Sequence, residues 1–114
     1  MPVESSPSDQ KQLTNGIIFV LRTGQKHSFP YSQLVSCCLE ENPEHTSDKN
    51  APSQFLVLDY ANHRVITLGE RLDEVLDRIN EGTLSHLVAV DGRYTNLNTN
   101  QPFVTEIVIQ KSEV

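Results

Sequence analysis

Short runs of consecutive apolar residues, separated by polar stretches with turn-forming residues, are the main pattern along this chain. The clearest run covers residues 17–21, whose branched and bulky side chains favour a β-strand. Turn signals at Thr23-Gly24 and Ala61-Asn62 would each fold such a run back as a hairpin. The pattern predicts strands at residues 16–22, 26–29, 54–60, 63–68, 84–90 and 103–110.

Residues 72–79 have the pattern of an amphipathic helix. Apolar side chains recur at intervals of three and four residues, which places them on one face: Leu72, Val75, Leu76 and Ile79. Thr67 and Glu70 fit a capping box at the start of the helix. Gly82 stands where a left-handed residue commonly ends one. We expect Leu76 to lie in the hydrophobic core.

A second helix is predicted after the first hairpin. Pro30-Tyr31-Ser32 opens it, and Asn42-Pro43 ends it because proline disfavours helical backbone in the preceding residue. Its apolar face would hold Leu34, Val35, Cys38 and Leu39. The order of hairpin and then helix would thus occur twice, at an offset of 38 residues from position 17 to position 55. This indicates either an internal repeat or two unrelated units that align because they share that order.

The expected fold is therefore α+β, in the order ββα-ββα-ββ. It would be a mostly antiparallel sheet of about six strands with two helices packed on it. Residues 17–21 and 55–58 are apolar at consecutive positions, which is typical of strands that are covered on both faces. We expect that cover to come from a second sheet layer, from barrel closure or from a partner chain.

The chain has 114 residues, which suits one domain. Residues 1–13 are polar and are expected to form a flexible N-terminal tail, and residues 14–114 to form a single α+β domain. Within that domain residues 42–53 contain one apolar residue, Ala51, and are expected to form a mobile surface loop because they bury too little to offset the entropy of ordering.

The charge of the chain argues against a nucleic-acid partner. Nine Lys and Arg residues face fifteen Asp and Glu residues, for a net charge of −6, and no basic stripe is present to neutralise the phosphates of a nucleic acid. No apolar run approaches the roughly 20 residues of a membrane span. Cys37 and Cys38 are adjacent and do not suit a disulfide, so with no export signal the expected compartment is the cytoplasm.

No catalytic, cofactor-binding or metal-binding motif is present in the sequence. The four histidines, His27, His45, His63 and His86, have no metal-ligand spacing. Cys38 is expected to be a core residue on the helix face and Cys37 to lie at its margin, in mid-helix, where a thiol is not activated. The sequence therefore predicts no cofactor and no metal.

Acidic residues form two further candidate sites. Asp73 and Asp77, like Glu70 and Glu74, are four residues apart on the predicted helix and are expected to face water. The loop Asp91-Gly92-Arg93-Tyr94 combines a charge pair with an aromatic ring, which suits an interface but is also common in ordinary turns.

Three functions remain open from the sequence. The leading hypothesis is a small, soluble, non-enzymatic protein-interaction or regulatory module. The second is a small-molecule-binding domain with a pocket between sheet and helices, lined by His27, Tyr31 or His86. The third is an enzyme whose site is shared across a dimer.

The C-terminal strand at 103–110 favours self-association. It is apolar on both faces, with Phe103, Thr105, Ile107 and Ile109 expected on one face and Val104, Glu106 and Val108 on the other. Soluble proteins usually protect such a strand with charges or a covering element. A homodimer that covers its edge or one of its faces is therefore expected.

Overall fold

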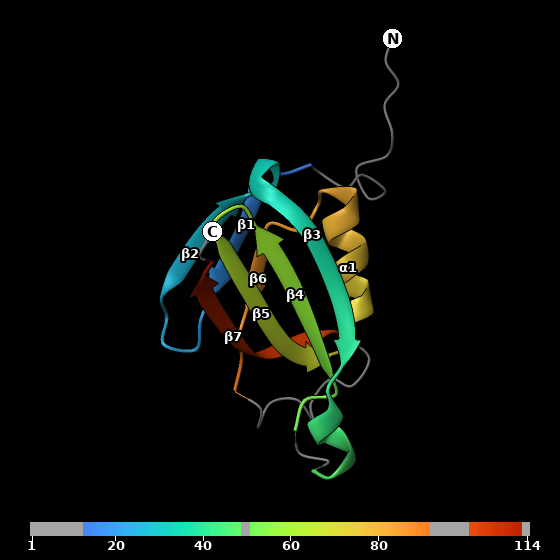
Figure 1. Ribbon diagram of the computed structural model, residues 1–114. Helices are drawn as coiled ribbons and strands as arrows, with labels where there is room; N and C mark the ends of the chain where they lie inside the picture. The colour runs from blue at the N-terminus through green and yellow to red at the C-terminus, as the bar shows by residue number, and fades with distance from the viewer. Residues whose placement is uncertain (1–12, 49–50, 92–100, 113–114) are drawn as a thin grey trace.

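The computed structural model describes residues 13–48, 51–91 and 101–112, which form strands, one α-helix and two short 3-10 turns (Figure 1). The α+β class and the mostly antiparallel pairing are confirmed. The elements follow in the order β1 (Gly16–Val20), β2 (Lys26–Pro30), η2 (Tyr31–Gln33), β3 (Leu34–Glu41), η3 (Pro43–Thr46), β4 (Gln54–Tyr60), β5 (His63–Glu70), α1 (Leu72–Glu81), β6 (His86–Val88) and β7 (Phe103–Lys111).

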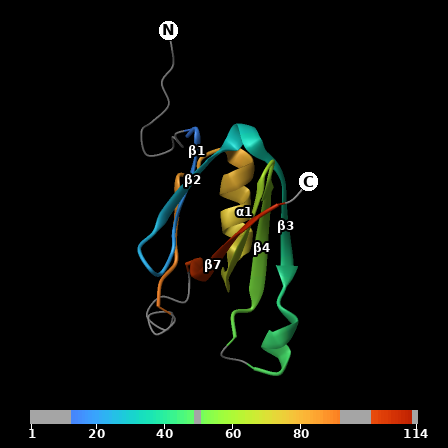
Figure 2. The same cartoon turned by 60° about the vertical axis from the view of Figure 1, so that its left-hand side comes forward.

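The strands lie in two sheets rather than the single sheet predicted. The first has the order β2-β1-β6, with β1 antiparallel to β2 and parallel to β6, and the second has the order β3-β4-β5-β7, all antiparallel. Figure 2 shows the β1–β2 hairpin on one side, β3 and β4 on the other, and α1 between them. A bridge between Ala89 and Val104 joins the two sheets.

The core lies between the sheets and explains why two form. Ile17, Phe19 and Phe29 of the first sheet are buried against Leu56, Leu58, Tyr60 and Val65 of the second. One helix offers too little apolar surface to cover both inward faces, so each sheet covers the other. The rings of Phe29 and Tyr60 stack with their centroids 4.6 Å apart, and Phe19 meets both edge-on.

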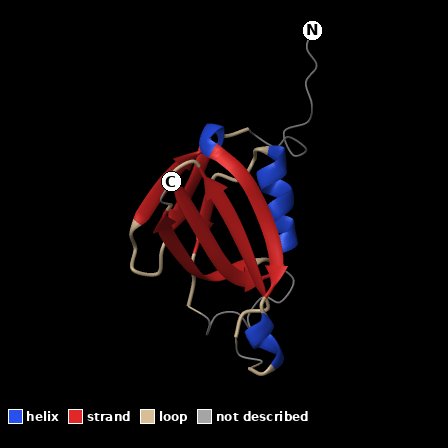
Figure 3. Cartoon of the chain, in the orientation of Figure 1, coloured by secondary structure: helices blue, strands red, loops and turns tan. Residues whose placement is uncertain are grey.

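The predicted helix after the first hairpin is wrong, because that segment forms η2 and then β3 (Figure 3). Leu34, Cys37 and Leu39 are half-buried and pack against the core. An irregularity between Leu34 and Ser36 shifts the alternation of the strand, so these three residues share its inner side. Of the predicted helix face, Leu34 and Leu39 point inward, whereas Val35 is 73% exposed and Cys38 is exposed. Pairing with β4 over the length of the strand satisfies its backbone. The predicted ββα-ββα-ββ order and the hairpin–helix repeat are therefore not formed.

The predicted helix at 72–79 is confirmed, but its predicted capping box is wrong. Thr67 is fully buried in β5, where its hydroxyl donates to the carbonyl oxygen of Leu56 at 3.0 Å. The N-cap is Arg71, with φ of 57°, and the backbone N–H of Leu72 donates to Oε1 of Gln54 at 2.7 Å. At the other end Gly82 has φ of 74°, and its backbone N–H donates to the carbonyl oxygen of Ile79, as predicted.

Strand β7 does not alternate as predicted. A bulge opposite Leu68 and Gly69 makes Thr105 the extra residue, so Val104 and Ile107 both point into the core and Val108 points outward. The backbones of β5 and β7 come close here, and a side chain at Gly69 would collide with the carbonyl oxygen of Phe103. The predicted grouping of Phe103 with Ile107 on one face is therefore wrong.

Polar contacts join the two ends of the segment expected to be a mobile loop. Asn42 is buried, and its side chain donates to the carbonyl oxygen of Pro52 at 2.7 Å and accepts from the N–H of Glu44. Glu70 accepts from the N–H of Ser53 at 2.9 Å. Mobility of this loop stays a prediction, as does the flexible tail, of which residues 1–12 lie outside the described part of the chain.

Candidate interaction surface

The outer face of the β3-β4-β5-β7 sheet points away from the core and toward the viewer in Figure 1. The strand register arranges its side chains in three rows across the sheet. The central row is Cys38, Val57, Ile66 and Val108; the row on one side of it is Glu40, Phe55, Leu68 and Glu106; the row on the other side is Ser36, Asp59, Arg64 and Gln110. These twelve residues are called the outer face below.

Apolar side chains occupy the middle of the outer face. Phe55, Val57, Ile66, Leu68 and Val108 are adjacent and half-buried among themselves. Helix α1 contacts β3 and β4 from the opposite side, where Leu72, Val75 and Ile79 enter the core. Within residues 13–48, 51–91 and 101–112 no helix or strand packs over the outer face.

One ion pair lies beside this apolar centre. Nε of Arg64 donates to Oδ1 of Asp59 at 2.7 Å, and the hydroxyl of Ser36 donates to Oδ2 of Asp59 at 3.4 Å. The hydrogen bond to Asp59 raises the pKa of Arg64. A shallow hollow of about 370 Å³ covers this part of the face and is lined by residues of three strands: Cys38, Glu40, Phe55, Val57, Asp59, Arg64 and Ile66.

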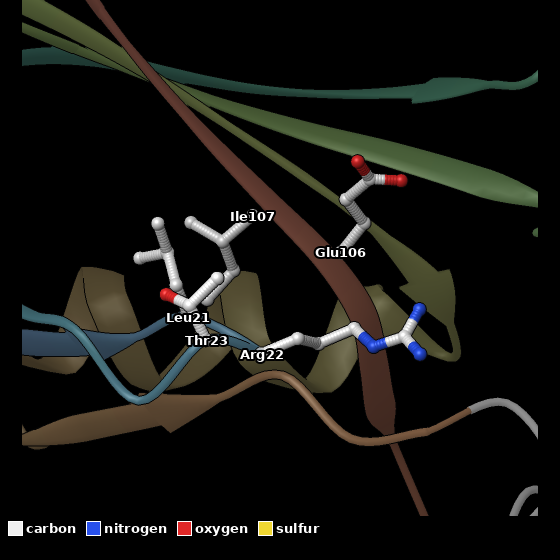
Figure 4. A pocket seen from close by; sticks show the side chains of 5 residues that line it. All are labelled: Leu21, Arg22, Thr23, Glu106 and Ile107. Carbon is white, nitrogen blue, oxygen red and sulfur yellow. The ribbon is translucent and has the colours of Figure 1, made fainter.

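A second hollow of about 410 Å³ lies between the β1–β2 turn and β7 (Figure 4). Leu21, Thr23 and Ile107 gather at one end of it, and Arg22 and Glu106 lie at the other. Arg22 forms a long ion pair with Asp91, at 3.9 Å. The other residues of the loop predicted as an interface, Gly92, Arg93 and Tyr94, lie outside the described part of the chain.

The three residues proposed to line a small-molecule pocket are not brought together. His27 pairs with Phe19 on the inner side of β2, whereas His86 pairs with Ile18 on the outer side of the same sheet and is exposed. The hydroxyl of Tyr31 donates to the carbonyl oxygen of Leu84 at 2.7 Å, and burial raises the pKa of Tyr31. His27, Tyr31 and His86 therefore lie in separate places and do not line one pocket.

The two cysteines point to opposite faces of β3. Cys37 faces inward, and burial raises the pKa of its thiol to about 11, with smaller contributions from Cys38 and Asp59. Cys38 is exposed on the outer face, which corrects its prediction as a core residue. Its pKa is also raised, by desolvation first and then by Glu40, whose carboxylate accepts from the Cys38 thiol at 3.6 Å. Neither environment favours the reactive thiolate.

Among the carboxylates considered from the sequence, Asp73, Glu74 and Asp77 lie on α1 and are exposed, as predicted. Glu70 belongs to β5 rather than to the helix, and it also accepts a hydrogen bond from the Ser53 hydroxyl. In the described ranges no group of three or more His, Cys, Asp or Glu side chains could hold a metal ion. None of the helices there is long and apolar enough to span a membrane.

The outer face was only partly visible in the sequence. Consecutive apolar residues at 55–58 indicated that both faces of a strand need cover. Asp59 and Arg64 flank a turn signal, so their cross-strand pairing could have been found from the hairpin register. The positions of β3 and β7 beside this hairpin depend on long-range pairing. Comparisons of the chain with protein-family profiles, curated protein sequences and solved structures found no match.

Proposed function

We propose that this chain is a non-enzymatic protein-interaction or regulatory module and that the outer face is its binding surface. The observation that supports the proposal is the group of five adjacent apolar side chains, Phe55, Val57, Ile66, Leu68 and Val108, on a sheet face that no other described element covers. Such a face, bordered by charged residues, is typical of a surface that binds another protein.

The composition of the face supports a protein partner. Its charged side chains carry both signs and lie at the border, with Glu40 and Glu106 on one side and the Asp59–Arg64 pair on the other. This arrangement provides an apolar centre and a polar rim. Two unbridged cysteines support a reducing compartment such as the cytoplasm.

The test is a pair of matched substitutions on two different sheets. Ile66→Lys places a charge in the centre of the outer face, and Val88→Lys places the same charge at an exposed position of β6. Both variants should remain folded, with melting temperatures within about 5 °C of the wild type, because neither position lies in the core. Association of the full chain, with itself or with proteins copurified from its host, should be lost in the first variant only.

Two results would contradict this function. If Ile66→Lys unfolds the chain, the outer face contributes to the core rather than to binding. If every associated protein is retained by Ile66→Lys, the binding surface lies elsewhere.

A further inference from the structure

The outer face is self-complementary about a line between β4 and β5. Across that line, the register pairs Phe55 with Leu68, Val57 with Ile66, and Asp59 with Arg64. Apolar residues are thus matched with apolar residues, and an acid is matched with a base. A symmetric dimer needs such a patch, because each residue must fit the residue to which the twofold axis brings it.

We propose that a second copy of this chain covers the outer face, with the twofold axis along this line between β4 and β5. This inference rests on the proposed function, since it assigns the partner of the same surface. The rotation lays β4 of one copy over β5 of the other. It brings Val57 of one copy against Ile66 of the other, and Phe55 against Leu68. Because of the twofold symmetry, each of these contacts occurs twice.

The charges select this axis over the alternative. Under the proposed rotation the Asp59 carboxylate of one copy meets the Arg64 guanidinium of the other, so the ion pair within each chain becomes a ring of four alternating charges. An axis across the strands, along the central row, would instead set Asp59 against Phe55 and Arg64 against Leu68. That arrangement would desolvate charged groups against apolar ones, which is costly.

The same rotation accounts for the hollow on the face. The hollow of about 370 Å³ lies over β3, β4 and β5 and does not reach β7. The second copy brings Val108 over Cys38, and its own Val57 and Ile66 over the middle of the hollow. Apolar side chains therefore enter the concave part of the face, where they exclude water.

Two features limit the affinity of the proposed dimer: like charges at its edge and the small area of the face. The rotation places Glu40 of one copy near Glu106 of the other, and both side chains are exposed. With four strands about 4.8 Å apart and three rows about 6.6 Å apart, the face measures roughly 20 by 20 Å. That is below the area of about 800 Å² per partner found in stable complexes, so we expect a dissociation constant in the micromolar range.

The experiment uses two charge variants that can recognise each other but not themselves. In Asp59→Arg the interface would set two guanidinium groups together, and in Arg64→Asp it would set two carboxylates together. The side chains of Arg64 and Asp59 are 51% and 34% exposed, so both variants should fold. Each alone should associate at least about tenfold more weakly than the wild type.

Mixing the two variants should restore association to within about threefold of the wild type, because both contacts between the chains are then between opposite charges. Sedimentation equilibrium between about 5 and 300 µM measures the mass, between 12.8 kDa for the monomer and about twice that for the dimer. At equal total concentration the mixture should have a mass near that of the wild type, and each variant alone a clearly lower one. Arg22→Asp is the control: it reverses a charge on the β1–β2 turn, outside the proposed interface, and alone it should associate as the wild type does.

A wild-type mass that stays near 12.8 kDa up to about 300 µM would overturn the second-copy inference. Dimers of the wild type without recovery on mixing would overturn the proposed axis. The proposed function has a separate readout: a monomeric chain that binds another protein in an Ile66-dependent way would reject the second copy but retain the function. A chain with no Ile66-dependent association would reject both.

Discussion

At the scale of single residues, Tyr60 is a buried residue with an unsatisfied polar group. Its side chain is buried among Phe19 and Phe29, and its hydroxyl has no hydrogen-bond partner among the described residues. Burial raises the pKa of Tyr60. A buried hydroxyl without a partner costs free energy of desolvation that a phenyl ring does not.

Tyr60→Phe should therefore leave the free energy of unfolding within about 1 kcal/mol of the wild type, or raise it. Urea denaturation measures this change. Tyr31→Phe is the matched control and should lose about 1 kcal/mol, because the Tyr31 hydroxyl donates to the carbonyl of Leu84. A larger loss in Tyr60→Phe than in Tyr31→Phe would show that the Tyr60 hydroxyl has a bound partner.

Cys37 makes stability depend on pH in the alkaline range. Burial raises the pKa of its thiol to about 11, whereas an unfolded thiol ionises near about 8.5. The folded state therefore holds this proton more tightly than the unfolded state. The resulting stability is complete below the unfolded pKa and is lost as the pH rises through the folded pKa.

The free energy of unfolding should thus fall between about pH 8.5 and 11, and it should fall less in Cys37→Ala. Denaturation at about pH 7, 9 and 10 compares the slopes. Cys38→Ala, which removes the exposed thiol, should keep most of the wild-type slope. Equal slopes in the wild type and Cys37→Ala would mean that this thiol is not desolvated by folding.

At the scale of elements, those marked by local signals are easier to predict than those that depend on pairing with another segment. The sequence predicts a strand at residues 54–60, and β4 has the same bounds, because its apolar run and its turn are local signals. It predicts a helix in place of β3 because Leu34, Val35, Cys38 and Leu39 have a helical spacing, although Val35 and Cys38 are exposed in the strand. Only the pairing of this segment with β4 distinguishes a strand from a helix here. Likewise, the cap from Gln54 to α1 joins residues 18 positions apart.

Helix α1 provides a test of which apolar residues stabilise the core. The sequence grouped Leu76 with Val75 and Ile79, but Leu76 is only half-buried at the border of the core, whereas Ile79 is 5% exposed. Ile79→Ala should cost about 2–5 kcal/mol of unfolding free energy, as is usual for a buried isoleucine. Leu76→Ala should cost about half as much or less. Equal losses in urea denaturation would mean that Leu76 is as deeply packed as the sequence predicted.

At the scale of the whole molecule, the sequence indicated that the apolar strands need cover on both faces, but not how the cover is divided. The inward faces of the two sheets cover each other, and α1 closes the space beside them (Figure 2). The outer face of the second sheet remains uncovered among the described residues. Its three rows combine residues from 36 to 110, so they could not be assembled before the strand order was known.

The division into an inner and an outer face is tested by two neighbouring positions of β7. Ile107 is 6% exposed and faces the core, and Val108 lies in the central row of the outer face. Ile107→Lys should unfold the chain or lower its melting temperature by more than about 10 °C, because a charge buried without a partner costs several kcal/mol. Val108→Lys should retain the fold, since its ammonium group can reach water, and should weaken self-association. Circular dichroism with thermal melting measures the first effect and sedimentation the second. If Val108→Lys were the variant that unfolds, the bulge at Thr105 would be misplaced by one residue and the outer face would be part of the core.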